Sequence, residues 1–208
     1  MSKDGLIEET IFEFLAGHLP MSELESWVYS ESALQPYFGE DDYLELISLD
    51  FRGAEGRYRV EKLFKSHVTG AAFITWYISR LARRIIARTE NVQEDIYTLY
   101  ELYCRGYDFL RTLGMSYGLR IGVPPVTHYR GTWDDLSPAQ KVDLIDSFYP
   151  QIAEEARLLL SVLEDGRIVI TNASIDSIHP GRPHLPIYDD HRTTDEKLQM
   201  EPPVLIID

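Results

Sequence analysis

Apolar residues recur at intervals of three and four through most of the chain, which is the spacing of one face of an α-helix. Near the amino end this pattern predicts a first helix, with glutamates on its other face, that Gly17 and Pro20 end. Its apolar stripe is Leu6, Ile7, Ile11, Phe14 and Leu15. Ser22 and Glu25 have the spacing of a capping box and predict a second, short helix that begins at Ser22. A third short apolar element, residues 43–51, is also predicted to be helical.

Longer helical patterns fill the middle of the chain. One helix is predicted over residues 71–89, and a second over 92–113 with Asn91 as its N-cap. The apolar stripe of the second comprises Tyr97, Tyr100, Tyr103, Cys104, Tyr107 and Leu110. We expect its tyrosines to pack in the core with their hydroxyls at the surface, rather than to form an aromatic binding platform. A last helix begins with Ser137 as N-cap and Pro138 at its first position, and Pro150 should kink it near its middle.

Two regions depart from helical periodicity. Residues 114–133 contain four glycines and the pair Pro124-Pro125, and they predict a long loop or extended crossing of the kind that often carries function. Residues 167–171 follow an Asp-Gly turn and are β-branched, which predicts a β-strand. Because a lone strand leaves its backbone groups unpaired, it needs a partner. The candidates are residues 119–123, residues 203–207 or a second chain.

These patterns together predict a mainly α protein, a multi-helix bundle of six or seven helices with a minor β element near the C-terminus. We expect a helical domain over residues 1–171, with a sub-boundary near 52–56, and a C-terminal arm over 172–208. A chain of 208 residues with 44% apolar residues can bury a sizeable core. The single cysteine, Cys104, lies in an apolar helical pattern and is expected to be a packed thiol in a reducing compartment. With neither a signal-peptide pattern nor a membrane-spanning stretch, the sequence predicts a cytoplasmic protein.

Charge is distributed unevenly along the chain. The first fifty-one residues hold twelve acids against Lys3 alone, whereas residues 52–90 hold nine Lys or Arg against three acids. A concentrated negative field favours a positively charged partner and argues against nucleic acid, which is bound through Lys and Arg. The basic segment contains a group at helical spacing, Arg80, Arg83, Arg84 and Arg88. We expect a solvated helix face that pairs with the N-terminal acids, with phosphate or carboxylate binding as the alternative.

Candidate chemistry is sparse. The sequence contains no GxSxG, GxGxxG, GxxxxGK, HExxH or CxxC motif. The potential metal ligands of the C-terminal arm are His179, His184, Asp189, Asp190 and His191, and their spacing among prolines favours a stiff surface segment. Asp108, His128 and Ser137 supply the residue types of a catalytic triad, as almost any chain of this size does. The sequence therefore indicates no catalytic residue, no metal site and no cofactor.

Three runs resemble the opening of small bacterial immunity-type proteins: residues 14–17 (FLAG), 24–29 (LESWVY) and 43–51 (YLELISLDF). Proteins of that kind are cytoplasmic antidotes encoded beside polymorphic or contact-dependent toxins, and they act by plugging or covering the toxin. The resemblance covers the first fifty or so residues, and its motifs consist largely of packing residues. It implies a binding protein without catalytic residues, and it identifies no individual contact residue.

The leading hypothesis is a non-catalytic protein-binding module, an immunity protein that neutralises a basic partner through an acidic surface. Its expected contact residues are the acids Glu40, Asp41, Asp42 and Glu45, with Trp27 or Tyr43 as aromatic anchors. One alternative is an enzyme with a pocket between helix 92–113 and the 114–133 segment, which would bind a small anionic ligand through Arg120, His128 or Tyr129. Another is a scaffold or oligomerisation module joined through a terminal strand. The sequence leaves the oligomeric state open.

Overall fold

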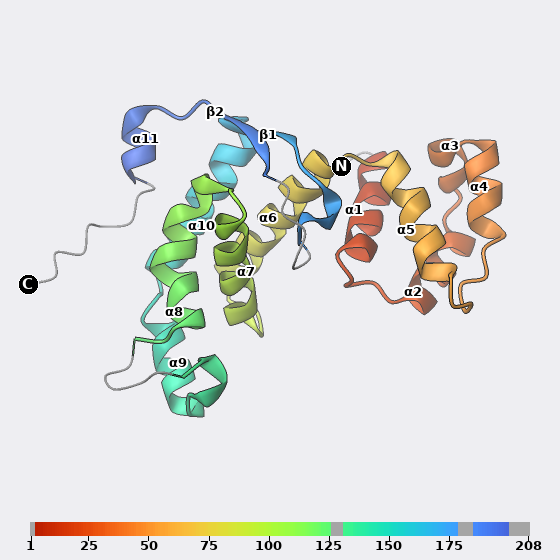
Figure 1. Cartoon of the computed structure of the whole chain (residues 1–208). Helices are drawn as coiled ribbons and strands as arrows, with labels where there is room; N and C mark the ends of the chain where they lie inside the picture. Colours follow the sequence, from red (N-terminus) through yellow and green to blue (C-terminus); the bar gives the residue numbers. More distant parts are fainter. Residues whose placement is uncertain (1–2, 126–130, 179–184, 200–208) are drawn as a thin grey trace, which may run out of the picture. The chain divides into compact units, whose positions relative to one another are not determined.

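The computed structural model describes residues 3–125, 131–178 and 185–199. It confirms a mainly α protein with a minor β element near the C-terminus (Figure 1). The described residues contain eleven α-helices rather than six or seven. Pro150 divides one expected helix into two, and short helices form over residues 34–38, 119–122 and 194–199, where none is predicted. No helix in these ranges combines the length and apolar character that crossing a membrane requires.

The chain forms two compact units. The first comprises residues 1–77 and 174–178, and the second comprises 78–173 and 179–208. The division falls inside one long helix, α6 (Gly70–Ala87). Segment 52–56, where the sequence suggests a sub-boundary, forms the turn between α4 and α5 within the first unit.

The first unit is a small bundle of short helices (Figure 1). Besides the start of α6 and the 3-10 helix η4 (Ile175–Ile178), it contains α1 (Lys3–Leu15), α2 (Met21–Ser30), α3 (Leu34–Phe38), α4 (Glu40–Ile47) and α5 (Gly56–His67). Buried aromatic rings hold these helices together: Phe14 of α1 and Phe38 of α3 both pack on Phe64 of α5, with ring centroids 5.6 and 5.8 Å apart. Such ring pairs add stability beyond the apolar area that they bury.

Two local predictions in the first unit are wrong. Leu6 is not part of the core stripe of α1, because its side chain is 52% exposed while Ile7 is 2% exposed. Ser22 is not the N-cap of α2; Pro20 occupies that position, and its carbonyl accepts hydrogen bonds from the amides of Glu23 and Leu24 at 3.1 and 3.0 Å. The fixed φ of proline starts the helix two residues earlier than the capping-box pattern suggests.

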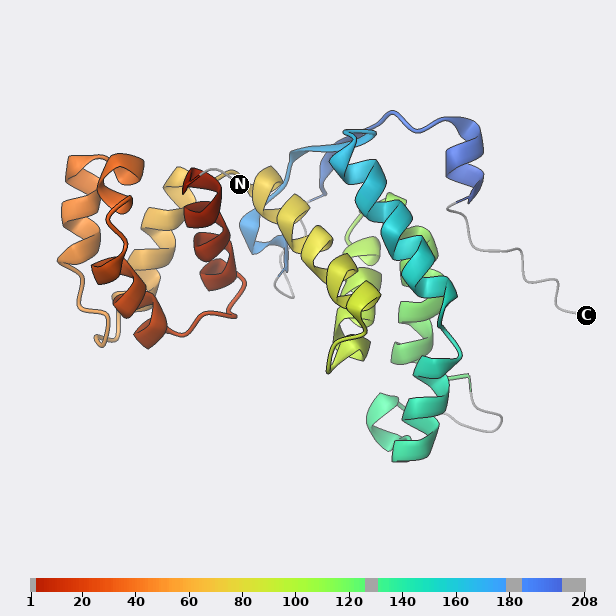
Figure 2. The ribbon, with the colours of Figure 1, turned by 180° about the vertical axis from the view of Figure 1, so that it is seen from behind.

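The second unit contains the rest of α6 and the helices that pack around it, seen from behind in Figure 2. Its helical elements are α7 (Val92–Cys104), η1 (Asp108–Leu110), η2 (Leu113–Gly118), α8 (Leu119–Gly122), η3 (Trp133–Asp135), α9 (Pro138–Asp146), α10 (Gln151–Glu164) and α11 (Thr194–Gln199). The predicted helix 92–113 is therefore wrong at its end. It stops at Cys104 because Gly106 takes a φ of +100°, which glycine adopts readily and which no α-helix contains.

The buried face of α7 also differs from the predicted tyrosine stripe. Val92, Asp95, Ile96, Leu99 and Leu102 are the buried residues of this helix, so its aliphatic side chains form its core contact. Asn91 occupies the N-cap position as expected, although its side chain makes no capping hydrogen bond. The expectation of a packed thiol is wrong as well, because Cys104 is exposed at the C-terminal end of α7.

Residues 114–122, expected to begin a long loop or extended crossing, are helical. The π-helix η2 and the short α8 carry Gly114, Gly118 and Gly122, four residues apart, and α7 lies directly against them. A Cβ atom on Gly118 would lie 2.5 Å from Tyr100 Cβ, so only glycine allows this approach. The row of small residues therefore lets two helical segments pack at close range, which explains the glycines without a flexible loop.

The predicted kinked helix after Ser137 is two helices. The expected cap is present, since Gln140 N donates to Ser137 Oγ at 3.3 Å and Ser137 N donates to Gln140 Oε1 at 2.9 Å. The helix α9 ends at Asp146, however, and α10 begins after Pro150. Proline cannot donate an amide hydrogen bond and therefore separates the two helices instead of bending one.

The β element is a two-stranded antiparallel sheet of β1 (Ile168–Asn172) and β2 (Ile187–Asp190). The strand is confirmed, but its partner is a segment of the arm itself. Residues 119–123 are largely helical, and residues 203–207 lie outside the described range. Thr171 Oγ1 also donates to the carbonyl of Ile187, at 3.0 Å. The chain between the strands is too long for a tight hairpin turn, so local sequence gives no signal for this pairing.

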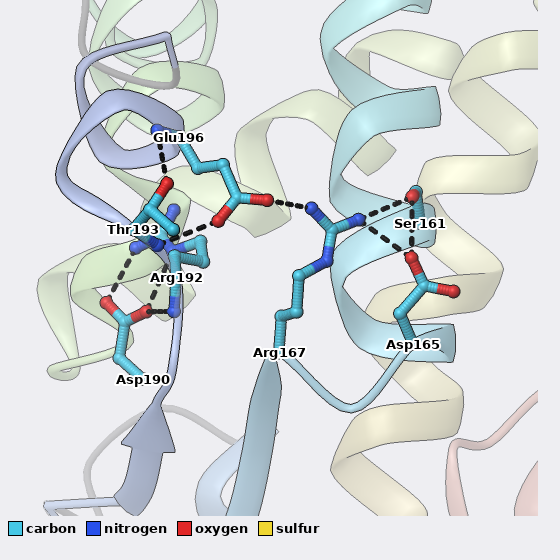
Figure 3. A network of polar contacts seen from close by, with 7 residues as sticks. All are labelled: Ser161, Asp165, Arg167, Asp190, Arg192, Thr193 and Glu196. Carbon is cyan, nitrogen blue, oxygen red and sulfur yellow. Dashed lines mark hydrogen bonds and ion pairs between the residues drawn. The ribbon is translucent and has the colours of Figure 1, made fainter.

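Polar contacts join residues 190–196 of the arm to one another and to the end of α10 (Figure 3). Arg167, just before β1, lies at their centre: its guanidinium donates to Glu196 of α11, to Ser161 Oγ at 2.7 Å and to Asp165 Oδ2 at 2.8 Å. Glu196 and Thr193 cap α11 reciprocally, with Thr193 N donating to Glu196 Oε2 at 2.7 Å. Arg192 holds Asp190 by two hydrogen bonds of 2.9 Å. These contacts therefore hold residues 190–196 of the arm on this unit.

Candidate functional site

The acids expected to contact a partner lie on α4 of the first unit. Gly39 precedes the helix with a φ of +80°, which ends α3 and allows the chain to turn into α4. Glu40, Asp41 and Asp42 then occupy its first turn, where carboxylates interact favourably with the unpaired amides of the helix N-terminus. Their place at a helix start, as the sequence predicts, is confirmed.

The outer face of α4 brings three of the four predicted acids together. Glu40, Asp41, Leu44 and Glu45 are all exposed, and their spacing of one and four residues puts them on the same side of the helix. Leu44 is 52% exposed, so an apolar side chain stands among three carboxylates. We call these four residues the α4 acidic face.

The charge of this face is only partly neutralised. Glu45 Oε1 lies 3.3 Å from Arg59 Nη2 of α5, and both side chains are about half exposed, a setting in which ion pairs are weak. In the described part of the chain, Glu40 and Asp41 form no ion pair. The first unit carries fifteen acids against six Lys and Arg, so its negative surplus cannot be cancelled internally.

Asp42 and Tyr43 point to other surroundings. Asp42 Oδ2 lies 2.7 Å from His67 Nε2 of α5, and the His67 ring packs edge-on against Phe38 at 4.7 Å. Asp42 therefore helps to join α4 to α5, and Tyr43 is half-buried on the same helix. The structure thus separates these two residues from the α4 acidic face.

Trp27, the other expected anchor, lines a groove between α1 and α2. The groove has a volume of about 440 Å³, and its lining includes Leu6, Glu9, Glu13, Leu19, Trp27 and Glu31. None of the described lining residues belongs to α4, so Trp27 and the predicted acids form two separate features of the first unit. The sequence did not predict this groove, because the spacing of Leu6 placed it in the buried apolar stripe of α1 rather than on the exposed face.

Electrostatics at the start of α1 reflect the same negative surplus. Burial, followed by the nearby charges of Glu8 and Asp4, raises the pKa of Tyr37 to about 12. Asp4 and Glu9 are exposed and Glu8 is half-buried. Acids therefore line α1 as well as α4, and Glu8 and Asp4 of α1 both act on Tyr37.

Three arginines of the basic group, Arg83, Arg84 and Arg88, pair with acids other than the predicted N-terminal ones. Arg84 Nε donates to both carboxylate oxygens of Asp95, Arg83 Nη2 lies 3.2 Å from Glu164, and Arg88 pairs with Asp146. All of these acids belong to the second unit. In the described residues, the N-terminal acids contact other basic side chains instead, namely His18, Arg52, Arg59 and His67.

A second cavity lies where the alternative enzyme hypothesis places one. It has a volume of about 390 Å³ and is lined by α7 and by segments on both sides of residues 126–130, including Glu94, Tyr97, Ile121, Trp133 and Asp134. Its described lining carries two carboxylates and no Lys or Arg, which suits a cation better than the expected anion. Arg120 is not among these residues; its guanidinium lies 4.9 Å from the Phe148 ring centroid. His128 and Tyr129 lie outside the described range.

The other candidate residues, the metal ligands and the triad set, do not form a site in residues 3–125, 131–178 and 185–199. These ranges contain no group of three or more His, Cys, Asp or Glu side chains arranged to hold a metal ion. His179 and His184 fall outside them, as does His128 of the triad set. Ser137 serves as a helix cap and Asp190 is held by Arg192.

Comparison of the chain with protein-family models, with curated proteins and with solved structures finds no match. The candidate sites are therefore argued from their own geometry.

Proposed function

We propose that this chain is a non-catalytic module that binds a basic protein through the acidic surface of its first unit, as an immunity-type protein binds and covers its toxin. The observation that carries the proposal is the α4 acidic face. It presents Glu40 and Asp41 without ion pairs among the described residues, next to the exposed apolar side chain of Leu44. A basic partner can neutralise these carboxylates and cover the leucine in one contact.

The physical advantage of such a surface is fast capture. A patch of one sign steers an oppositely charged partner and raises its association rate, by about 10- to 1,000-fold, with a strong dependence on ionic strength. An antidote that must reach a toxin before the toxin acts requires this property. We place Glu40, Asp41 and Glu45 at the contact and assign Asp42 to holding α4 against α5.

The test begins with the partner. The full chain, produced in its native host, is cross-linked and its stoichiometric complexes are purified, and association with the recovered partner is measured by stopped flow at increasing salt. We expect a 1:1 complex with a basic protein and an association rate that falls steeply with salt. Recovery of an acidic partner or of none, or an association rate that ignores salt, would exclude the proposal.

The residue-level test compares two double variants with the same change of charge. E40K/D41K reverses two acids of the α4 acidic face, and D143K/E154K reverses two exposed acids of the second unit that form no ion pair among the described residues. The first variant should slow association with the recovered partner at least tenfold at low salt, whereas the second should change it little. Equal effects would mean that net charge alone governs association.

A further inference from the structure

We propose that the groove between α1 and α2 is an anchoring site for an amphipathic helix of the basic partner, one that carries Lys or Arg beside an apolar residue. This inference rests on the proposed function, and it adds a second contact with a defined chemistry. The α4 acidic face accounts for attraction over distance, whereas the groove accounts for short-range fit.

The shape of the groove suits a helix. Leu6, Glu9 and Glu13 line it from α1 at spacings of three and four residues. Trp27 of α2 and Glu31, the C-cap residue of that helix, line the other side. The stretch from Leu6 to Glu13 is two helical turns, about 10 Å long. The volume of the groove, about 440 Å³, lies within the range of about 300–1,000 Å³ that is usual for ligand clefts. A partner helix would present residues i, i+3, i+4 and i+7 to a trough of this kind.

The apolar part of the lining gives the occupant its hydrophobic contact. Leu6 is 52% exposed although the next residue, Ile7, is almost fully buried and also lines the groove. Leu19 and Trp27 are half-buried there. Tryptophan in a partly enclosed, apolar setting is among the side chains that contribute most to protein interfaces. An apolar residue of the partner would cover Leu6 and the indole together.

The charged part of the lining selects a basic occupant. Glu9, Glu13 and Glu31 contribute three carboxylates, and no described lining residue is Lys or Arg. Two of these carboxylates also have local contacts: Glu13 Oε2 lies 3.1 Å from His18 Nδ1, and Glu31 Oε1 accepts a hydrogen bond from Ala33 N. Glu9 is exposed and forms no ion pair among the described residues.

A long basic side chain matches both parts of the lining at once. The methylene stem of Lys or Arg packs on apolar surface while its charged end stays accessible to carboxylates, and a cation near an indole face gains a further attraction. An acidic or purely apolar helix lacks one half of this match. The complementarity of charge therefore identifies the occupant as a basic amphipathic helix.

The experiment uses the full chain and a synthetic helical peptide with Leu at positions i, i+3, i+4 and i+7 and Lys elsewhere. Binding is measured by calorimetry, and the Trp27 indole signal is followed by NMR after assignment with W27F. We expect binding with a shift of that signal. Two control peptides, one with Glu in place of Lys and one with Ser in place of Leu, should bind at least tenfold more weakly.

Matched variants locate the contact without disturbing the core. Leu6 and Leu44 are equally exposed, at 52%, and lie on different helices of the same unit, so L6S and L44S remove comparable apolar surface. Glu9 and Glu23 are both exposed acids without ion pairs in the described residues, and only Glu9 lines the groove. L6S and E9K should each weaken the peptide about tenfold, and L44S and E23K should leave its affinity nearly unchanged.

The outcomes separate this inference from the proposed function. If the peptide is weakened by L44S and E40K/D41K but not by L6S or E9K, the groove is not the anchoring site, and binding through the α4 acidic face stands. If the Ser-containing peptide binds as well as the Leu-containing one, the groove attracts the peptide only through its carboxylates and makes no apolar contact with it. The inference then fails. If neither the peptide nor the recovered basic partner binds the wild-type chain, both proposals fail.

Discussion

Gly118 packs directly against Tyr100. A Cβ atom at Gly118 would lie 2.5 Å from Tyr100 Cβ and 2.8 Å from the carbonyl oxygen of Ile96. The three nearest atoms are Ile96 O and Tyr100 Cα, which belong to the backbone of α7, and Tyr100 Cβ. None of these atoms moves when a side chain rotates, so rotation cannot relieve the clash. The approach of η2 to α7 therefore depends on this glycine.

We predict that G118A destabilises the protein by about 1–3 kcal/mol, the usual cost of overpacking, even though alanine favours a helix more than glycine does. G122A is the matched control. Its Cβ would lie 2.8 Å from Cε2 of Tyr97, the far end of a side chain that is 36% exposed and can move aside. Urea unfolding of both variants is the measurement. Equal stabilities for G118A and G122A would contradict the packing argument.

The glycine row shows what local pattern can and cannot predict. Strong amphipathic periods and the Ser137 cap follow from residues close in sequence, and these elements are where the pattern puts them. Glycines such as Gly114, Gly118 and Gly122 are found both in flexible loops and where two helices pack closely. Which of these structures forms depends on whether another helix packs against them, and local sequence does not show that. The pairing of β1 with β2 is likewise set by tertiary contacts.

The candidate sites divide in the same way. Acids at the start of α4 are predictable because helix starts favour carboxylates and Gly39 marks the boundary. The groove is not predictable, because it depends on where Leu19 and Trp27 lie relative to α1 and on Leu6 facing solvent. A residue one step away from the core period can be buried or exposed, and the amino-acid type alone does not decide which.

Arg84 and Asp95 supply a second prediction. Asp95 is 6% exposed, and Arg84 Nε donates to its two oxygens at 3.0 and 2.9 Å. Burial raises the pKa of Asp95, and the hydrogen bond and charge of Arg84 oppose that rise. R84M leaves a buried carboxylate without its main partner and should destabilise the protein by about 3 kcal/mol. Chemical denaturation measures this loss.

The double variant R84M/D95L tests whether the unpaired charge is the cause. Replacing both partners removes the buried carboxylate together with the cation, so most of the stability should return. Acidification gives an independent check, because protonation of Asp95 in R84M should recover part of the loss. If R84M/D95L is no more stable than R84M, the cost comes from lost packing rather than from the charge.

Glu155 supplies a prediction of pH dependence. Its Oε1 accepts hydrogen bonds from Tyr117 and Gln151, whereas Oε2 is buried without a hydrogen-bond partner among the described residues. Glu155 and Thr112 both line a cavity of about 10 Å³. Burial raises the pKa of Glu155, and the hydrogen bonds from Tyr117 and Gln151 only partly offset that rise. The folded state therefore holds this proton to higher pH than the unfolded state does, and stability falls as pH rises from the ordinary glutamate value through the raised one.

E155Q should remove this component and stabilise the protein at neutral pH by about 1 kcal/mol, the low end of the cost of a buried unsatisfied group. E154Q, at the exposed neighbouring position of α10, is the control and should keep the wild-type pH profile. Thermal unfolding from acidic to neutral pH gives the comparison, and a loss of stability in E155Q at neutral pH would refute the assignment.

The C-terminal arm gives the last prediction. Arg192 holds Asp190 in a bidentate pair and, as the main cause, lowers the pKa of Asp190 to about 2. A lowered carboxylate pKa adds stability that is fully present above the ordinary value of 3.8 and is lost as pH falls through about 2. The contact between Asp190 and Arg192 should therefore survive mild acid and weaken only in this low range.

At neutral pH, D190N replaces the charged acceptor and should release the end of the arm, whereas D189N changes the exposed neighbour in the same strand and should not. R167Q should have an effect like that of D190N, because Arg167 joins Glu196 of α11 to Ser161 and Asp165 near the end of α10 (Figure 3). Hydrogen exchange of the amides of residues 190–197 is the measurement. Faster exchange confined to that segment in D190N and R167Q confirms the anchor, because global destabilisation would speed exchange in α6 and α10 as well.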